Sequence, residues 1–240
     1  MIFADIHIHA LSGVDDGPKR EEEMFEMIAM EYEIGVRFLC LTPHFHPGYF
    51  SDNKEESEKV FALLQAHCKE KYPDLVLALG NELRFHPRCV SWLNDGQGRT
   101  MNSTKYVLID FSEWESKEII KKGLDCLLNA GYIPILAHVE RYRKLLGDLE
   151  FIREYRANGV KIQLDAESLF RGFGLRAKKF CNMILEYRLA DFVASDSHSH
   201  NNRIPVLDMQ KAYAYIEKKC GEAYAKEVCC DNARQMIFNQ

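Results

Sequence analysis

Short apolar runs alternate with longer helical patterns along almost the whole chain, and this alternation limits the possible folds more than any other feature of the sequence. Each apolar run has the length of a buried strand, and each intervening segment has room for a helix. The alternation is typical of successive β-α units around a parallel sheet. The predicted strands are Phe3–Ile8, Arg37–Leu41, Leu75–Leu79, Tyr106–Ile109, Ile133–Ala137, Lys161–Leu164 and Asp191–Ala194.

Helical spacing of apolar residues marks the segments between these strands, and Gly35 and Gly131 follow two of them as stop signals. No linker or internal repeat divides the chain, so we expect residues 1–240 to form a single α/β domain. Seven β-α units in one domain favour a closed or nearly closed barrel over an open sheet, although spacing alone leaves both open. The predicted helices are Glu21–Ile34, Glu55–Glu70, Ser116–Ala130, Leu149–Ala157, Leu175–Tyr187, Val206–Lys219 and Glu222–Phe238.

The amino-acid composition of the chain excludes several classes of protein. Of the 240 residues 47% are hydrophobic, enough for a large core without disulfides, and the eight cysteines include no CxxC pair. The net charge of -5 argues against a nucleic-acid-binding protein, which would carry a basic surplus. No apolar stretch is long enough to cross a membrane, and the N-terminus lacks a signal-peptide pattern. We therefore expect a cytoplasmic protein with reduced thiols, no membrane insertion and no nucleic-acid partner.

Histidines and carboxylates follow nearly every predicted strand. Because parallel strands bring their carboxyl ends to one edge of a sheet or one mouth of a barrel, these side chains are expected to converge there. Alternation in the sequence IHIH points His7 and His9 to the same side. The sixth strand is the exception, with Asp165 and Glu167 as weak candidates only. The convergent set is His7, His9, Asp16, His44, Glu82, Asp110, His138, Asp196 and His198.

Imidazoles and carboxylates in such numbers predict metal binding. Imidazole nitrogens suit zinc, manganese and iron, and a carboxylate can bridge two ions. Nine ligands exceed what one ion can use, so two or three divalent ions are implied. Ions about 3.5–4 Å apart can clamp a phosphoryl group and generate a hydroxide at neutral pH. A purely structural role is the better interpretation for His46, His67, His86 and His200, and Asp15 fits the start of a turn.

Other chemistries lack their motifs. The sequence contains no GxGxxG, GxxxxGK[ST] or GxSxG, so dinucleotide binding, a P-loop and a serine nucleophile elbow are unsupported. No cysteine is separated from an arginine by the five residues of a cysteine-phosphatase loop. Any phosphatase activity must therefore use metal ions.

Six motifs, in the order DIHIH, VDDGP, TPHF, GNE, AHVERY and SDSH, resemble the PHP (polymerase and histidinol phosphatase) superfamily over Asp5 to about Arg203. Within it the chain is most similar to the manganese-dependent protein-tyrosine phosphatases of bacterial capsule and exopolysaccharide biosynthesis. The resemblance implies a distorted seven-stranded TIM-like barrel (a (β/α)7 fold) and a trinuclear metal site.

The same resemblance implies a role for each site residue. One ion would bind His7, His9, Glu82 and Asp196; a second would bind Glu82, Asp110 and His138; a third would bind Asp16, His44 and His198. Arg141 and Arg203 would bind the substrate phosphate, as guanidinium groups do well. The family usually has glutamate where this chain has Asp110, which leaves open whether Asp110 binds metal directly or acts on residues that do. LDAESLF also differs from the more usual NAGSLL.

The implied activity is that of a phosphoric monoester hydrolase: a metal-activated hydroxide attacks phosphotyrosine, with two to three ions, manganese first and iron, zinc or cobalt also acceptable. The implied partner is a tyrosine-phosphorylated protein, in particular a polysaccharide-biosynthesis tyrosine kinase. Three alternatives stay open at this stage. They are a PHP phosphoesterase acting on a small phosphomonoester such as histidinol phosphate, a non-catalytic metal-binding interaction module, and a metal-dependent amidohydrolase.

Overall fold

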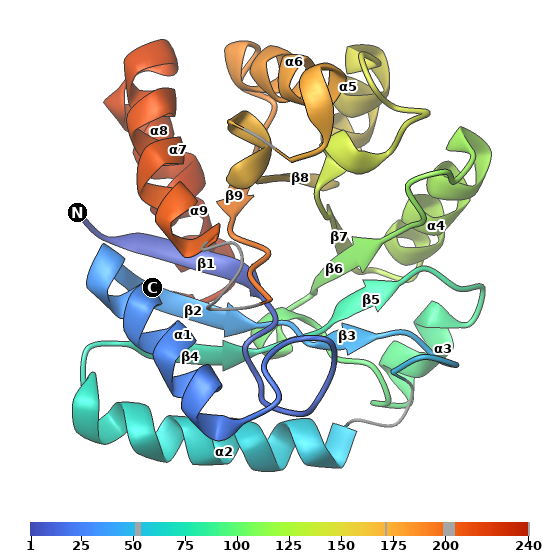
Figure 1. Ribbon diagram of the computed structural model, residues 1–240. Coiled ribbons are helices and arrows are strands. Elements are labelled where there is room, and N and C mark those ends of the chain that lie inside the picture. The colour runs from blue at the N-terminus through green and yellow to red at the C-terminus, as the bar shows by residue number, and fades with distance from the viewer. Residues whose placement is uncertain (51–53, 171, 199–204, 240) are drawn as a thin grey trace.

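A barrel of parallel strands surrounded by helices makes up the chain (Figure 1). The computed structural model describes residues 1–50, 54–170, 172–198 and 205–239. All seven predicted strands occur in these residues, with two short strands, β3 and β5, in addition. The strands are β1 (Phe3–Ile8), β2 (Val36–Leu41), β3 (His44–Phe45), β4 (Val76–Leu79), β5 (Glu82–Arg84), β6 (Tyr106–Asp110), β7 (Ile133–Leu136), β8 (Lys161–Asp165) and β9 (Phe192–Ala194).

The strands pair in parallel in two sheets, of order β1-β2-β4 and β3-β5-β6-β7-β8-β9. The chain leaves the first sheet at the end of β2 and of β4 and enters the second as β3 and β5. Pro43, which has no N–H to donate, lies at the first of these breaks. The ring closes beyond β9, where Ile8 bridges Ser197 and the His9 N–H donates to the Ser197 carbonyl at 2.9 Å. The result is the distorted TIM-like barrel that the sequence predicts.

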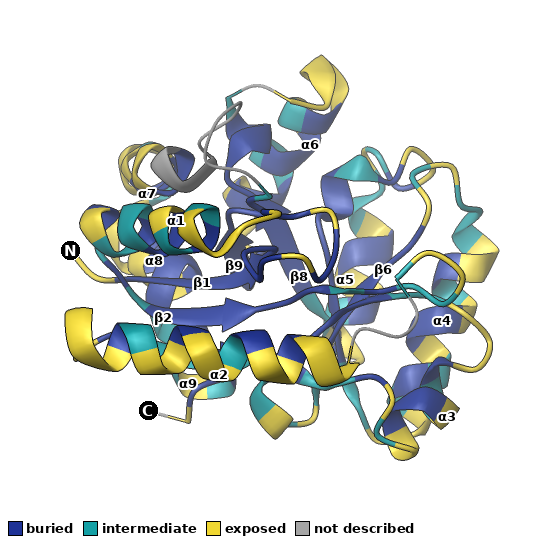
Figure 2. Ribbon diagram, turned by 60° about the horizontal axis from the view of Figure 1, so that its bottom comes forward, coloured by how far each residue is buried: buried dark blue, intermediate teal, exposed yellow. Residues whose placement is uncertain are grey.

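Helices cover the outside of the barrel, and their outer faces are exposed while most strand residues are buried (Figure 2). Gly35 ends the first helix in the left-handed region, at φ 106°, as its position predicts. Ser116 and Asp148 cap two others by accepting backbone N–H groups. The helices are α1 (Glu21–Ile34), α2 (Lys54–Lys71), α3 (Cys89–Asn94), α4 (Lys117–Asn129), α5 (Leu149–Ala157), α6 (Gly174–Glu186), α7 (Pro205–Cys220), α8 (Glu222–Lys226) and α9 (Asn232–Met236).

Two parts of this pattern differ from the sequence prediction. The single helix predicted for Glu222–Phe238 is divided, because a π-helical turn at Glu227–Asp231 separates α8 from α9. The short helix α3 was not predicted; six residues are too few for helical periodicity to be visible. None of the described helices is both long and apolar enough to cross a membrane.

A small apolar cluster fills the barrel below its mouth. It includes Ile6 of β1, Cys40 of β2 and, from the end of the chain, Phe238. The larger cluster lies between the strands and the helices. Inward-facing side chains are thus apolar at the amino ends of the strands, and the polar set described below occupies the carboxyl ends.

Candidate metal centre

A bulge in β1 aims its histidines into the barrel. Asp5 pairs with Leu39 and Ile8 pairs with Leu41, so three steps along β1 match two steps along β2. The extra residue allows Ile6 to join the inner apolar cluster while the next residue, His7, also faces the interior. His9 then lies on the same side as His7, and their Nε2 atoms are 3.2 Å apart. The predicted pairing of His7 and His9 is therefore observed, but a bulge contributes to it as well as simple alternation.

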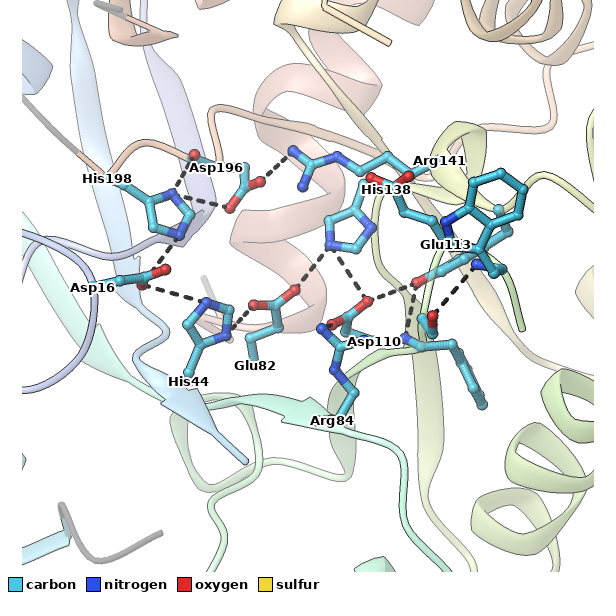
Figure 3. Close-up of a pocket in the computed structure, with 14 residues that line it drawn as sticks. Asp16, His44, Glu82, Arg84, Asp110, Glu113, His138, Arg141, Asp196 and His198 are labelled. Atoms are coloured by element: carbon cyan, nitrogen blue, oxygen red, sulfur yellow. Dashed lines mark hydrogen bonds and ion pairs between the residues drawn. The ribbon is translucent and has the colours of Figure 1, made fainter. Parts of the chain in front are cut away.

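Glu82, at the start of β5, is the hub of the site. Its carboxylate oxygens lie 3.5 Å from His7 Nε2, 3.4 Å from His9 Nε2, 2.9 Å from His138 Nε2 and 2.7 Å from His44 Nδ1. These imidazoles come from the end of β1, from β3 and from the segment after β7, so one carboxylate joins strand ends from around the barrel. Figure 3 shows Glu82 between His44 and His138. The position is well suited to a carboxylate that bridges two ions.

Two of the predicted ligands adopt left-handed backbone conformations. His138, directly after β7, has φ 31°, and Asp196, after β9, has φ 49°. Such conformations cost a non-glycine residue about 1–3 kcal/mol and are concentrated at functional sites. Here they turn both side chains from the strand ends into the mouth, where Asp196 Oδ1 lies 3.2 Å from His7 Nε2.

The hydrogen bonds of the two β1 imidazoles leave both Nε2 lone pairs free for a cation. His7 Nδ1 donates to the Gln163 side-chain oxygen at 3.0 Å, and His9 Nδ1 donates to Asp15 at 2.8 Å. With their protons on Nδ1, the two Nε2 atoms oppose each other as acceptors, beside the carboxylates of Glu82 and Asp196. Opposed lone pairs and carboxylates repel one another unless a cation lies among them, so the residues fit a divalent ion.

Asp16, His44 and His198 form an outer, more exposed group. Asp16 Oδ1 lies 3.4 Å from His44 Nε2 and 3.5 Å from His198 Nε2, and His9 completes the group. His198 Nδ1 donates to the carbonyl of Asp196, which leaves its Nε2 as an acceptor. The Asp16 side chain is 53% exposed, whereas that of Glu82 is 2% exposed. This group therefore opens to solvent at the rim of the site.

Asp110 divides its carboxylate between the cluster and an arginine. One oxygen forms an ion pair with Arg84 at 2.8 Å, and the other accepts from the Tyr142 hydroxyl at 3.3 Å and lies 3.8 Å from His138 Nε2. Burial, and then the nearby Glu82 carboxylate, raise the pKa of Asp110 above its usual range. Asp110, Glu82 and His138 still form a group compact enough to hold an ion.

Arg141 lies on the wall of the mouth, a cavity of about 410 Å³ that Arg84 also lines. Its guanidinium pairs with Asp165 at 2.5 Å and with Asp196, and Phe173 stacks over it with 4.3 Å between the guanidinium carbon and the ring centroid. Asp165, only a weak ligand candidate in the sequence, thus contacts an arginine. Arg203, the second predicted phosphate-binding residue, lies outside the described residues, as does His200.

The pKa shifts report the strong negative field of the cluster. Burial alone would lower the pKa of His7, but Asp196 and Glu82 outweigh it and raise that pKa to about 10. Burial acts likewise on His44, and Glu82 and Asp16 raise its pKa to about 11. Without a metal ion the site draws protons to His7 and His44, which is the response expected of a cation site, whereas burial and then His9 lower the pKa of His198.

Three residues of the site were not identified from the sequence as functional: Asp15, Gln163 and Arg84. Asp15 was interpreted as a turn residue, yet it is buried and also accepts the N–H groups of His44 and Gly17. Gly17 itself is required, because a Cβ there would lie 2.1 Å from the His9 carbonyl oxygen. A signal existed for the other two: Gln163 and Arg84 each lie two residues from an inward-facing acid on the same strand, Asp165 and Glu82.

The remaining described histidines contact aromatic side chains and lie outside the cluster. His46 packs against Tyr49, His67 stacks on Phe25 and His86 stacks on Trp92. None of the three belongs to a group of potential metal ligands among the described residues. A position close to a strand end therefore does not by itself place a histidine in the cluster.

The barrel and the cluster at its mouth define a metal-dependent hydrolase. The family model for capsular polysaccharide synthesis proteins, CpsB/CapC, matches residues 3–238, so the chain belongs to that family. It is 36% identical over 241 residues to the tyrosine-protein phosphatase CpsB of Streptococcus pneumoniae, covering 98% of each chain.

The comparison of this fold with solved structures gives the same assignment. A chain from the crystal structures of YwqE from Bacillus subtilis and CpsB from Streptococcus pneumoniae, described as metal-dependent tyrosine phosphatases, matches with a TM-score of 0.88 and 28% identity over 100% of this chain and 95% of that chain. Histidinol phosphate phosphatase from Lactococcus lactis matches with a TM-score of 0.58 and 15% identity over 89% of this chain and 93% of that chain, which shows the shared barrel fold.

Proposed function

We propose that this chain is a metal-dependent protein-tyrosine phosphatase that acts in capsular or exopolysaccharide synthesis. The observation that carries the proposal is the buried cluster around Glu82, in which the Nε2 atoms of His7 and His9 face each other and two carboxylates. Membership of the CpsB/CapC family and the similarity to named tyrosine phosphatases support the substrate class.

We propose that the cluster holds two to three divalent ions, with manganese as the first choice. His7, His9, Glu82 and Asp196 would hold one ion, and Glu82, Asp110 and His138 a second. Asp16, His44 and His198 would hold a third, with His9 close enough to contribute. When bound, such ions draw charge from the phosphoryl group and supply a nucleophile at neutral pH.

The protein itself would bind and orient the phosphate. The Arg141 guanidinium lies at the wall of the mouth, held by Asp165 and Asp196 and stacked on Phe173, so little side-chain freedom is lost when an anion binds. Arg203 is proposed to contribute a second guanidinium, and Arg84 faces the same cavity. No covalent intermediate on a protein nucleophile is needed for this route.

The proposed substrate is a tyrosine-phosphorylated protein, in particular a tyrosine kinase of polysaccharide biosynthesis. The similarity to tyrosine-protein phosphatases and the family's association with capsular polysaccharide synthesis support that choice. The mouth is open enough to admit a side chain from a protein: His44 and His198 are partly exposed, and Trp114 at the rim is 67% exposed.

Purified protein loaded with Mn²⁺ should be assayed on phosphotyrosine peptides, histidinol phosphate and a panel of small phosphomonoesters. We expect phosphotyrosine peptides to be the best substrates and His7→Ala and Asp196→Ala to reduce turnover by at least about 10³-fold without loss of the folded state. A preference for histidinol phosphate would replace the proposed substrate. Metal binding without any hydrolysis would favour a non-catalytic module, and near-normal rates in the variants would overturn the proposed site.

A further inference from the structure

A second cavity, of about 320 Å³, adjoins the mouth of the metal centre. Arg141 and Glu113 line both cavities, so the two are separated by no more than the thickness of these side chains. The wall farther from the metal centre is built by the start of α6 together with the segment after β7. Besides Arg141 and Glu113, the residues that line the second cavity are Glu140, Arg143, Leu146, Phe173, Gly174, Leu175 and Arg176.

Two arginines on this wall have no acidic partner in the part of the chain that the structure describes. Arg143 and Arg176 are both exposed, and neither forms an ion pair with a carboxylate of the described residues. Arg141, in contrast, is already paired with two aspartates. Of the two acids at the cavity, Glu140 is buried and accepts the Asp165 N–H, so the half-exposed Glu113 is the one carboxylate in the described lining that faces the two exposed arginines. The side chains that face solvent in this cavity therefore carry a net positive charge.

The start of α6 adds to this positive character. The helix has 13 residues, no acidic side chain in its first turn and an N-cap residue, Phe173, whose side chain cannot accept a hydrogen bond. Its first N–H groups and the positive end of its dipole are therefore available to an anion beside Arg176.

Apolar side chains frame the same cavity. Leu175 is 86% exposed and Phe173 is 39% exposed. Trp114, which lines the adjoining mouth, lies against Arg143 with 3.8 Å between the guanidinium carbon and the ring centroid. Large apolar side chains around unpaired guanidinium groups are typical of surfaces that bind peptides. A small inorganic anion would use the charges but not these apolar side chains.

We propose that the second cavity binds an acidic side chain, Asp or Glu, of the peptide segment next to the phosphotyrosine. This inference rests on the proposed function, because it assumes that the phosphotyrosine enters the mouth. An extended peptide advances about 3.3 Å per residue, so a side chain within a few positions of the phosphotyrosine reaches the adjoining cavity. There a carboxylate pairs with Arg143 and Arg176 while the neighbouring residues cover Phe173 and Leu175.

The test compares peptides of equal length that carry one phosphotyrosine flanked by Glu and Asp or by Gln and Asn, with p-nitrophenyl phosphate as a substrate too small to reach the second cavity. The variant is Arg143→Gln/Arg176→Gln in the full, metal-loaded chain. The control is Lys69→Gln/Lys218→Gln, which removes the same charge from exposed positions on α2 and α7.

For the unmodified protein and the control we expect kcat/KM about five- to tenfold higher on the acidic peptide, mainly through KM, as two exposed charge pairs allow. Salt should reduce this preference. In the arginine variant the preference should vanish while hydrolysis of p-nitrophenyl phosphate is unchanged. Equal rates on both peptides, or a preference that survives in the variant, would overturn the acidic subsite but leave the phosphatase proposal intact. Hydrolysis of p-nitrophenyl phosphate with no hydrolysis of either peptide would overturn both proposals.

Discussion

The inner and outer parts of the metal centre differ in how firmly the protein holds them. The inner part, around His7, His9 and Glu82, is buried, and the rings of both histidines are fixed by a hydrogen bond from Nδ1. The outer part includes Asp16 and His198, which are 53% and 31% exposed. Preorganised, buried ligands bind a cation more tightly than ligands that solvent can reach and reorient. We therefore expect the inner ions to be retained and the outer ion to exchange.

The largest expected effect is that of Glu82→Gln. The substitution keeps the shape of the side chain but removes the charge that faces four imidazoles. We expect kcat/KM for phosphotyrosine peptide to fall by at least about 10³-fold, because the carboxylate that is proposed to bridge two ions loses its charge. Metal analysis should show fewer bound ions. An exposed control, Glu118→Gln on α4, should behave like the unmodified protein. Full activity in Glu82→Gln would remove this residue from the centre of the site.

A smaller effect is expected for Asp15→Ala, which leaves every proposed ligand in place. It removes the acceptor for His9 Nδ1 and for the backbone N–H groups of His44 and Gly17. Loss of such orienting partners typically costs about 10–100-fold in metal affinity or activity. Titration with Mn²⁺ should show weaker binding, and rates at saturating metal should recover in part. No change in metal affinity would mean that Asp15 serves only the turn.

Asp16→Asn tests the outer part alone. We expect the loss of about one ion per chain in metal analysis and a fall of roughly tenfold in kcat/KM, with the inner ions retained. Dialysis against a chelator should remove the same ion first from the unmodified protein. If Asp16→Asn lost all its metal, the distinction between a firm inner part and an exchangeable outer part would be wrong.

The smallest effect concerns pH. The folded-state pKa of His7, raised to about 10, means that protonated His7 stabilises the metal-free protein below pH 6.5 and that this stabilisation is lost as pH rises through 10. Bound metal replaces the proton, so the gain in Tm on adding Mn²⁺ should grow by several degrees between pH 6.5 and 9. Calorimetry at a fixed metal concentration measures this gain in Tm at each pH. A gain that is constant with pH would contradict proton–metal competition at these imidazoles.

The sequence predicted much of the fold because strand and helix patterns are local. The bounds of β1, α1 and α5 agree with prediction to the residue, as apolar runs and end signals lie within each segment. The division of two barrel strands into β2–β3 and β4–β5 was missed, because it depends on how the strands bend to pass from one sheet to the other.

The types of the site residues, and the strand ends on which they lie, were determined by the sequence alone. Every described member of the predicted set lines the mouth or contacts a residue that does. Only the tertiary structure decided which partner each residue meets. Gln163 fixes a ring 156 positions away, and Arg84 takes one oxygen of Asp110. The physical reason is that hydrogen bonds depend on fractions of an ångström and on direction, which closure of the barrel sets and sequence spacing does not.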